Sequence, residues 1–133
     1  MEPSIQLEMN ANQASIIIKA LDLYSRLGIG QIDEIKTTMD VTFRRRDPLN
    51  NAEVDSHLTA LKELYFPELR GKSYYGIFCD KAPEKSKIAW DLIQVIRYAM
   101  AWERSPSGGF TVDFGEPIKS SLKEDLAIAK IKR

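Results

Sequence analysis

The feature that most constrains the fold is the segment between Pro83 and Ser105, which carries the longest helical pattern in the chain. Its apolar residues recur every three or four positions, as expected for the buried face of an α-helix. We therefore predict a helix over residues 84–104, with a main apolar stripe of Ile88, Leu92, Val95, Ile96 and Ala99. The row predicted to face solvent comprises Lys87, Asp91, Gln94 and Tyr98.

Three further segments show helical spacing. The first follows the N-cap candidates Asn10 and Asn12 and continues to Leu27. The second spans residues 32–46 and ends in three arginines, which suit the negative end of a helix dipole. The third spans residues 54–65 and stops before a proline.

Three short segments have the character of β-strands. Ser4–Met9 alternates polar and apolar residues, whereas Ser73–Cys79 and Phe110–Phe114 are rich in aromatic and β-branched residues. We predict that they form a small antiparallel sheet of about three strands, on which four or five helices pack. The predicted fold class is therefore α+β and mostly helical, in a single domain over residues 1–133.

Residues 119–133 form a predicted docking tail. Ser121 and Glu124 have the spacing of a helix-capping box, and an apolar stripe follows them. A helix this short is marginal in isolation, so we expect it to dock on the body of the protein or on another subunit. Self-association is predicted on this basis, with a homodimer as the default and higher oligomers left open.

Charge and composition argue against several classes of protein. The 19 basic and 19 acidic residues cancel, whereas a general nucleic-acid binder normally carries a basic excess. The single cysteine excludes an internal disulfide and any multi-cysteine metal site. No apolar run reaches the length of a membrane span, and the N-terminus lacks the pattern of a signal peptide. We expect a cytoplasmic protein that does not contact membranes.

No motif predicts a particular reaction. The run from Gly28 to Gly30 lacks the third glycine of a phosphate-binding loop and follows a helix instead of a strand. His57 is interpreted as a surface residue, and Cys79 as a packing residue with no histidine beside it in sequence. We predict neither a metal nor a cofactor, and the sequence leaves an enzymatic activity open while favouring a binding protein.

The run Arg44–Arg46 has two interpretations. Arginine side chains match phosphate oxygens in geometry, so the run could hold a phosphate group. A solvated helix end is favoured instead, because Asp40 and Asp47 partly neutralise the charge.

A candidate ligand site combines aromatic residues with one arginine. Tyr74 and Tyr75 lie beside a glycine, and Arg97 and Trp102 share the predicted helix over residues 84–104. An arginine can bind a phosphate while an aromatic ring stacks on a base, so these four residues are the predicted nucleotide-binding set. The alternative is that Arg97 forms a core ion pair with Asp113 or with an acid on its own helix.

Three segments together resemble small uncharacterised proteins of tailed phages and prophages. They are Ser73–Ile77, the helical run from Trp90 to Arg97, and Gly108–Phe114. The earlier stretch LDLYSRLGIGQIDEI has a similar sequence character. The resemblance covers roughly half of the chain. It implies a phage origin, and hence the cytoplasm of a host cell, but it implies little about mechanism.

Two classes of function follow from these observations. The first is a non-enzymatic protein that sequesters a nucleotide-like signal of host defence. The alternative is an inhibitor or adaptor that binds a host or phage protein and holds no small molecule. A nucleotide that copurifies with the protein would favour the first class.

Overall fold

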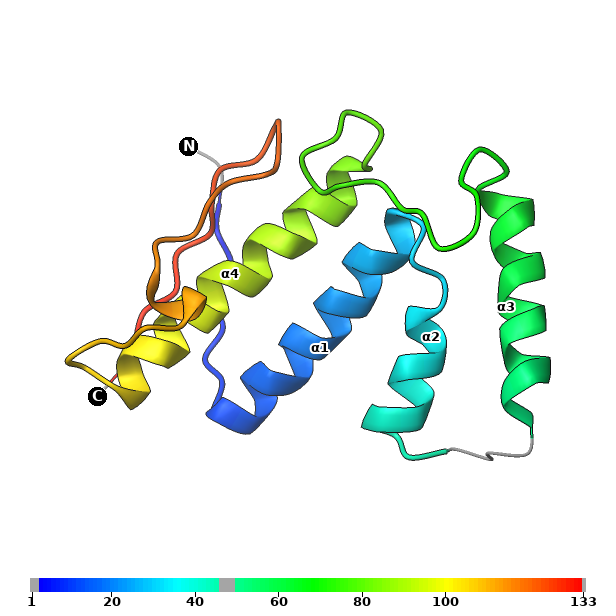
Figure 1. Cartoon of the computed structure of the whole chain (residues 1–133). Coiled ribbons are helices and arrows are strands. Elements are labelled where there is room, and N and C mark those ends of the chain that lie inside the picture. Colours follow the sequence, from blue (N-terminus) through cyan, green and yellow to red (C-terminus); the bar gives the residue numbers. More distant parts are fainter. Residues whose placement is uncertain (1–2, 46–49, 133) are drawn as a thin grey trace.

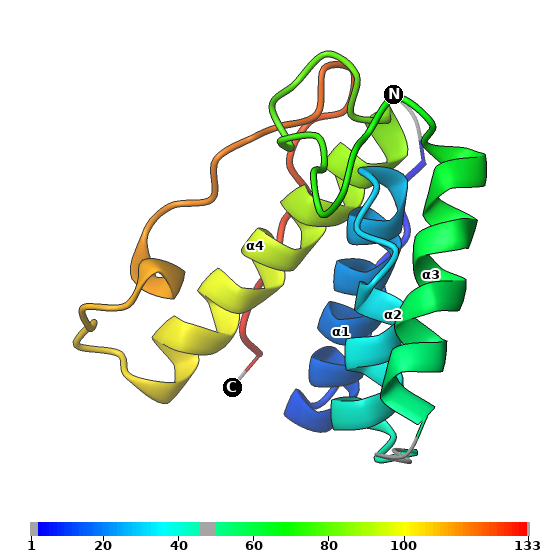
Figure 2. The same cartoon turned by 45° about the vertical axis from the view of Figure 1, so that its right-hand side comes forward.

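The structure is a computed structural model that describes residues 3–45 and 50–132 (Figure 1). Its elements in chain order are α1 (Ala11–Gly28), α2 (Glu34–Thr37), the π-helical turn η1 (Thr38–Thr42), α3 (Asn51–Tyr65), α4 (Glu84–Arg104) and the 3-10 turn η3 (Val112–Phe114). The helices lie side by side in the order α4, α1, α2 and α3, as both views show (Figures 1 and 2). The predicted α+β class is wrong, because the part of the chain that the structure describes contains helices and no strand or sheet.

The centre of the fold is the antiparallel pair of α1 and α4. Asn10 caps α1 in a capping box, in which its side chain accepts from the Gln13 amide at 2.9 Å and Gln13 returns a bond at 3.0 Å. At the far end of α1 the two helices approach closely, because Gly28 and Ser86 have small side chains. A Cβ at Gly28 would lie 1.9 Å from the Ser86 Oγ, and the Ser25 hydroxyl donates to the Ser86 carbonyl at 2.9 Å.

The apolar core between these helices is small. Ile93 is its largest fully buried apolar side chain, at 1% exposed. Small residues make up much of the rest, which consists of Ala14, Ile18, Ile29, Ile32, Ala82, Ala89, Val95 and Ala101. The core therefore depends on close approach of the two backbones more than on large side chains.

The segment Ser73–Cys79 is a loop, not the predicted strand. Its backbone is held by lysine side chains, since the Lys62 ammonium donates to the carbonyls of Gly71 and Ser73, and the Lys87 ammonium donates to that of Ile77. A strand needs a run of hydrogen bonds to a neighbouring backbone, and here one bond, from the Tyr75 amide to the Ile29 carbonyl at 2.9 Å, accompanies the lysine contacts. Aromatic and β-branched composition alone therefore gave the wrong prediction.

The other two predicted strands are also absent. Ser4–Met9 is extended but pairs with no other strand in the described part of the chain. Phe110–Phe114 instead contains η3, in which the Phe114 amide bonds to the Thr111 carbonyl at 3.2 Å. The Phe114 ring packs edge-on against Trp102, with centroids 5.4 Å apart. This aromatic contact with α4 fixes the segment as a turn.

The predicted C-terminal helix does not form in residues 120–132. One bond of the predicted capping box is present, because the Glu124 amide donates to the Ser121 Oγ at 2.9 Å. No helix continues from it, since the preceding residues bond to the side chains of α4. The second predicted helix is shorter than expected and ends with η1 at Thr42, and Arg46 lies outside the described residues.

The row of α4 predicted to face solvent is partly buried. Lys87 and Asp91 are 2% and 5% exposed, and Gln94 and Tyr98 are half-buried. The C-terminal segment covers this face. No helix in the described ranges is long and apolar enough to cross a membrane.

Replacing Ile93 by alanine tests the small core. Loss of this buried side chain should lower the free energy of unfolding by about 2–5 kcal/mol. The matched control is Ile16→Ala on α1, where the side chain is mostly exposed and the expected change is within about 0.5 kcal/mol. Urea denaturation followed by circular dichroism measures both, and equal effects of the two substitutions would contradict this description of the core.

Candidate functional site

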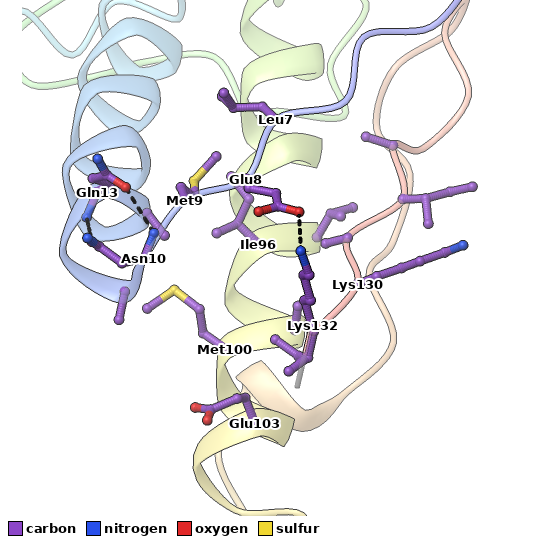
Figure 3. Close-up of a pocket in the computed structure, with 18 of the residues that line it drawn as sticks. Leu7, Glu8, Met9, Asn10, Gln13, Ile96, Met100, Glu103, Lys130 and Lys132 are labelled. Carbon is purple, nitrogen blue, oxygen red and sulfur yellow. Dashed lines mark hydrogen bonds and ion pairs between the residues drawn. The ribbon is translucent and has the colours of Figure 1, made fainter.

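A groove lies between two extended segments and the central helix pair. The N-terminal arm (residues 3–10) and the C-terminal arm (residues 124–132) form its sides, with the start of α1 and the second half of α4 as its floor. The groove has a volume of about 1020 Å³. Figure 3 shows Met9, Ile96 and Met100 lying between the two helices, and Lys130 and Lys132 on the C-terminal arm.

The groove is apolar in its interior and charged at its rim. Leu7, Met9 and Met100 are among the apolar side chains that line it. Methionine is flexible and polarisable, so such a lining accommodates irregular apolar surfaces. At the rim, the Lys132 ammonium lies 3.0 Å from the Glu8 carboxylate and joins the two arms (Figure 3). Both residues are highly exposed, so the pair contributes at most about 1 kcal/mol.

The C-terminal arm reaches the groove because side chains of α4 hold the chain just before it. The Asp91 carboxylate accepts from the amides of Ser120 and Ser121 at 2.8 and 3.0 Å, and the Ser120 hydroxyl lies 2.7 Å from it. Gln94 forms a two-bond pair with the backbone of Ile118, at 2.7 and 3.1 Å. We call residues 118–123 the latch segment.

Glu84 completes the attachment of the latch segment at the first turn of α4. Its carboxylate accepts from the amides of Leu122 and Lys123, each at 2.9 Å, and from the Ser121 hydroxyl. The hydrogen bond from Ser121 is the main cause that lowers the pKa of Glu84 below its ordinary value of 4.5, with the two amides adding to it. The backbone amides of an extended segment usually bond to a neighbouring strand. In the latch segment they bond instead to the side chains of Glu84, Asp91 and Gln94 on α4.

The predicted ligand residues lie at both ends of α4. Tyr74 and Tyr75 are in the loop before α4, where the Tyr75 amide donates to the Ile29 carbonyl at 2.9 Å. The Tyr75 hydroxyl donates to Glu68 at 2.6 Å, and this bond raises the pKa of Tyr75 to about 12. Tyr74 is exposed.

Trp102 lies near the opposite end of α4. Its indole donates to the Phe114 carbonyl at 3.3 Å, and the ring also meets Tyr98 at a centroid distance of 6.3 Å. Arg97 is exposed and forms no ion pair with any acidic residue that the structure describes. Trp102 lies 18 positions after Glu84, the first residue of α4, which is about 27 Å along the helix axis. The structure does not bring the tyrosines and the tryptophan together, and their binding of a nucleotide stays a prediction.

The remaining candidates lie on the surface. His57 is exposed and lies 3.7 Å from Glu53, its neighbour one turn earlier on α3. Cys79 is also exposed, which departs from the packing role expected for it. Arg44 and Arg45 are exposed at the end of η1. The described residues contain no group of three or more side chains that could hold a metal ion.

No protein-family model matches this chain, and neither a curated protein nor a solved structure matches it.

The polar residues that organise the site are not predicted by the sequence. Lys62, Lys87 and Asp91 are buried, although Lys87 and Asp91 belong to the row of α4 that the sequence predicts to face solvent. One feature of the sequence indicates that Asp91 and Glu84 could bind the same segment. They lie seven positions apart and therefore on one face of the helix. Their partner is the Ser-Ser run at residues 120 and 121, but nothing in the sequence connects the two.

Replacing Asp91 by asparagine tests the latch segment. The substitution presents an NH₂ group to amide donors, so the free energy of unfolding should fall by roughly 1–3 kcal/mol. The amides of Ser120 and Ser121 should lose hydrogen-exchange protection. Lys85→Gln, at an exposed position of the same helix outside the groove, is the control. Unchanged protection at Ser120 and Ser121 would show that Asp91 does not hold this segment.

The lowered pKa of Glu84 predicts that acid weakens the latch segment. A carboxyl group whose pKa is lower in the folded state stabilises that state above its unfolded-state pKa, here near 4.5. This stabilisation is lost as the pH falls through the lowered pKa. Hydrogen exchange at Leu122 and Lys123 should therefore rise as the pH decreases below 4.5, after correction for the intrinsic exchange rate. Glu84→Gln should remove this added pH dependence, and its persistence in that variant would refute the assignment.

Proposed function

We propose that the protein acts by binding a protein partner, as an inhibitor or adaptor, rather than by turnover. The observation that supports this proposal is the large solvent-accessible surface area of the chain. Its accessible area is 10304 Å², whereas a compact monomer of 15.1 kDa exposes about 7,100 Å². The surplus of about 3,200 Å² exceeds the roughly 800 Å² that one partner buries in a standard interface.

The outer face of α3 is the surface that fits such a partner. Leu64 is 80% exposed, and Tyr65 and Leu61 lie beside it on the same side of the helix. An apolar stripe on an exposed helix is the recognition element of helix-in-groove complexes. On α3, leucine and tyrosine supply that stripe.

The charge of α3 narrows the class of partner. Glu53 and Glu63 are exposed, whereas the one lysine of the helix, Lys62, is buried and bound to backbone carbonyls. A third acid, Asp55, is paired with Lys36 of α2 at 2.9 Å and so does not add to this charge. The exposed face of α3 is therefore acidic around its apolar stripe. A partner with an apolar groove bordered by lysine or arginine residues matches it in shape and in charge. Because the sequence resembles phage proteins, we infer that this partner is a host or phage protein.

The sequestration of a nucleotide is supported less well. A nucleotide site needs cations for the phosphates and an aromatic ring for the base in one place. The tyrosine loop and Trp102 lie at opposite ends of α4, and no aromatic side chain lines the groove. These placements favour a protein partner over a small anionic ligand.

Site-specific photo-crosslinking in the cells that express the protein tests the proposal. A photoreactive amino acid at Leu64 should give one dominant adduct, and peptide mapping should place it on an apolar surface flanked by basic residues. The same group at Ser56, exposed on another side of α3, is the control and should give no such adduct. Equal labelling at both positions, or no adduct together with a nucleotide retained in denaturing mass spectrometry, would overturn the proposal.

A further inference from the structure

The two arms expose apolar side chains that a single chain does not cover. Ile5 is 96% exposed and Ile128 is 82% exposed, and Leu7 is also mostly in solvent. Scattered surface leucines are ordinary, but here the apolar residues gather on two adjacent segments beside one groove. Such a concentration indicates a surface that is covered in the working protein.

Each arm is anchored only at its base, the N-terminal arm by the cap of α1 and the C-terminal arm by the latch segment. No backbone hydrogen bond joins residues 3–9 or 125–132 to another described residue. Their ion pairs are Glu8 with Lys132 at 3.0 Å and Asp125 with Lys119 at 3.6 Å, and such exposed surface pairs contribute little. Ordering an extended segment costs conformational entropy, so a further set of contacts has to hold the arms in place.

The groove between the arms is incomplete in one chain. Its interior is apolar, and its volume of about 1020 Å³ is larger than that of most small-molecule sites. The arms border it on two sides, as Figure 3 shows, and solvent fills the open side. An apolar surface from outside the chain would complete its wall.

The surface area and the charges favour a second copy of this chain as that missing wall. An obligate homodimer buries about 1,000–2,500 Å² on each protomer, which the surplus of about 3,200 Å² accommodates. In a two-fold interface one patch supplies both the protruding side chains and the groove that receives them. Here the arms supply the protruding side chains, and the groove between them can receive those of the other copy. The chain has no net charge, and the rim carries Glu8 and Glu103 as well as Arg104 and Lys130, so opposite charges can meet across the axis.

We propose that the arms and the groove form a homodimer interface, in which two copies pack groove to groove across a two-fold axis. Ile5 and Leu7 of each copy then fill the groove of the other. This surface is separate from the outer face of α3, so the inference goes beyond the proposed function. It also gives the predicted self-association a definite location, in the two arms together rather than in a C-terminal helix.

Sedimentation velocity of the full chain over a range of concentrations is the first test. The wild-type protein should sediment as a dimer. Leu7→Asp places a charge in the interface and should raise the dimer dissociation constant by about tenfold or more. Gln6→Asp adds the same charge on the same arm outside the groove, and should leave the dissociation constant within about threefold. Circular dichroism confirms that each variant is folded.

A distance measurement that leaves the apolar face intact is the second test. In a Cys79→Ser background, a spin label on Gln6→Cys should give a resolved distance between two chains. The homodimer would be overturned by a wild-type protein that sediments as a monomer or as an odd-numbered assembly. It would equally be overturned by a dimer that Leu7→Asp does not weaken, or by a spin label at position 6 that shows no dipolar coupling between chains. None of these outcomes affects crosslinking at Leu64, so the two proposals can fail separately.

Discussion

The close packing of α1 against α4 is the constraint on which the other parts of the structure depend. Gly28 and Ser86 let the two backbones approach, and Ile93 fills the space between the helices. With so few large apolar residues in this core, the remaining segments are attached mainly by polar bonds from helix side chains to loop backbone. Lys62 and Lys87 hold the loop before α4, and Glu84 and Asp91 hold the chain after it.

This mode of attachment explains why the chain exposes so much apolar surface. Segments held through their backbones leave their own side chains free to face outward, as Leu122 does in the latch segment. The arms differ, because no backbone hydrogen bond joins residues 3–9 or 125–132 to another described residue, but their apolar side chains are likewise uncovered in one chain. Many of the large apolar residues outside the central helix pair are exposed, among them Leu64 on α3 and Ile5 and Ile128 on the arms.

Helical periodicity was reliable where a helix packs along its length. The predicted helix over residues 84–104 is α4, and the capping residue Asn10 starts α1 as expected. The strand predictions failed for a different reason. A strand exists only with a backbone partner, and in Ser73–Cys79 lysine ammonium groups bind the carbonyls instead. The capping-box motif at Ser121 likewise formed one of its bonds without a helix, because Glu84 holds the same hydroxyl.

The sequence by itself determined the positions of the long helices, the cap of α1 and the balance of charge, since these depend on residues that are neighbours in the chain. Only the tertiary structure decided which charged residues are buried and what the extended segments contact. Asp91 and Ser120 are 29 positions apart, and their bond exists because α4 and the latch segment meet in space. The spacing of residues along the chain carries no information on which distant segments pack together. The sequence alone therefore could not distinguish these buried polar residues from polar residues on a solvent-exposed helix face.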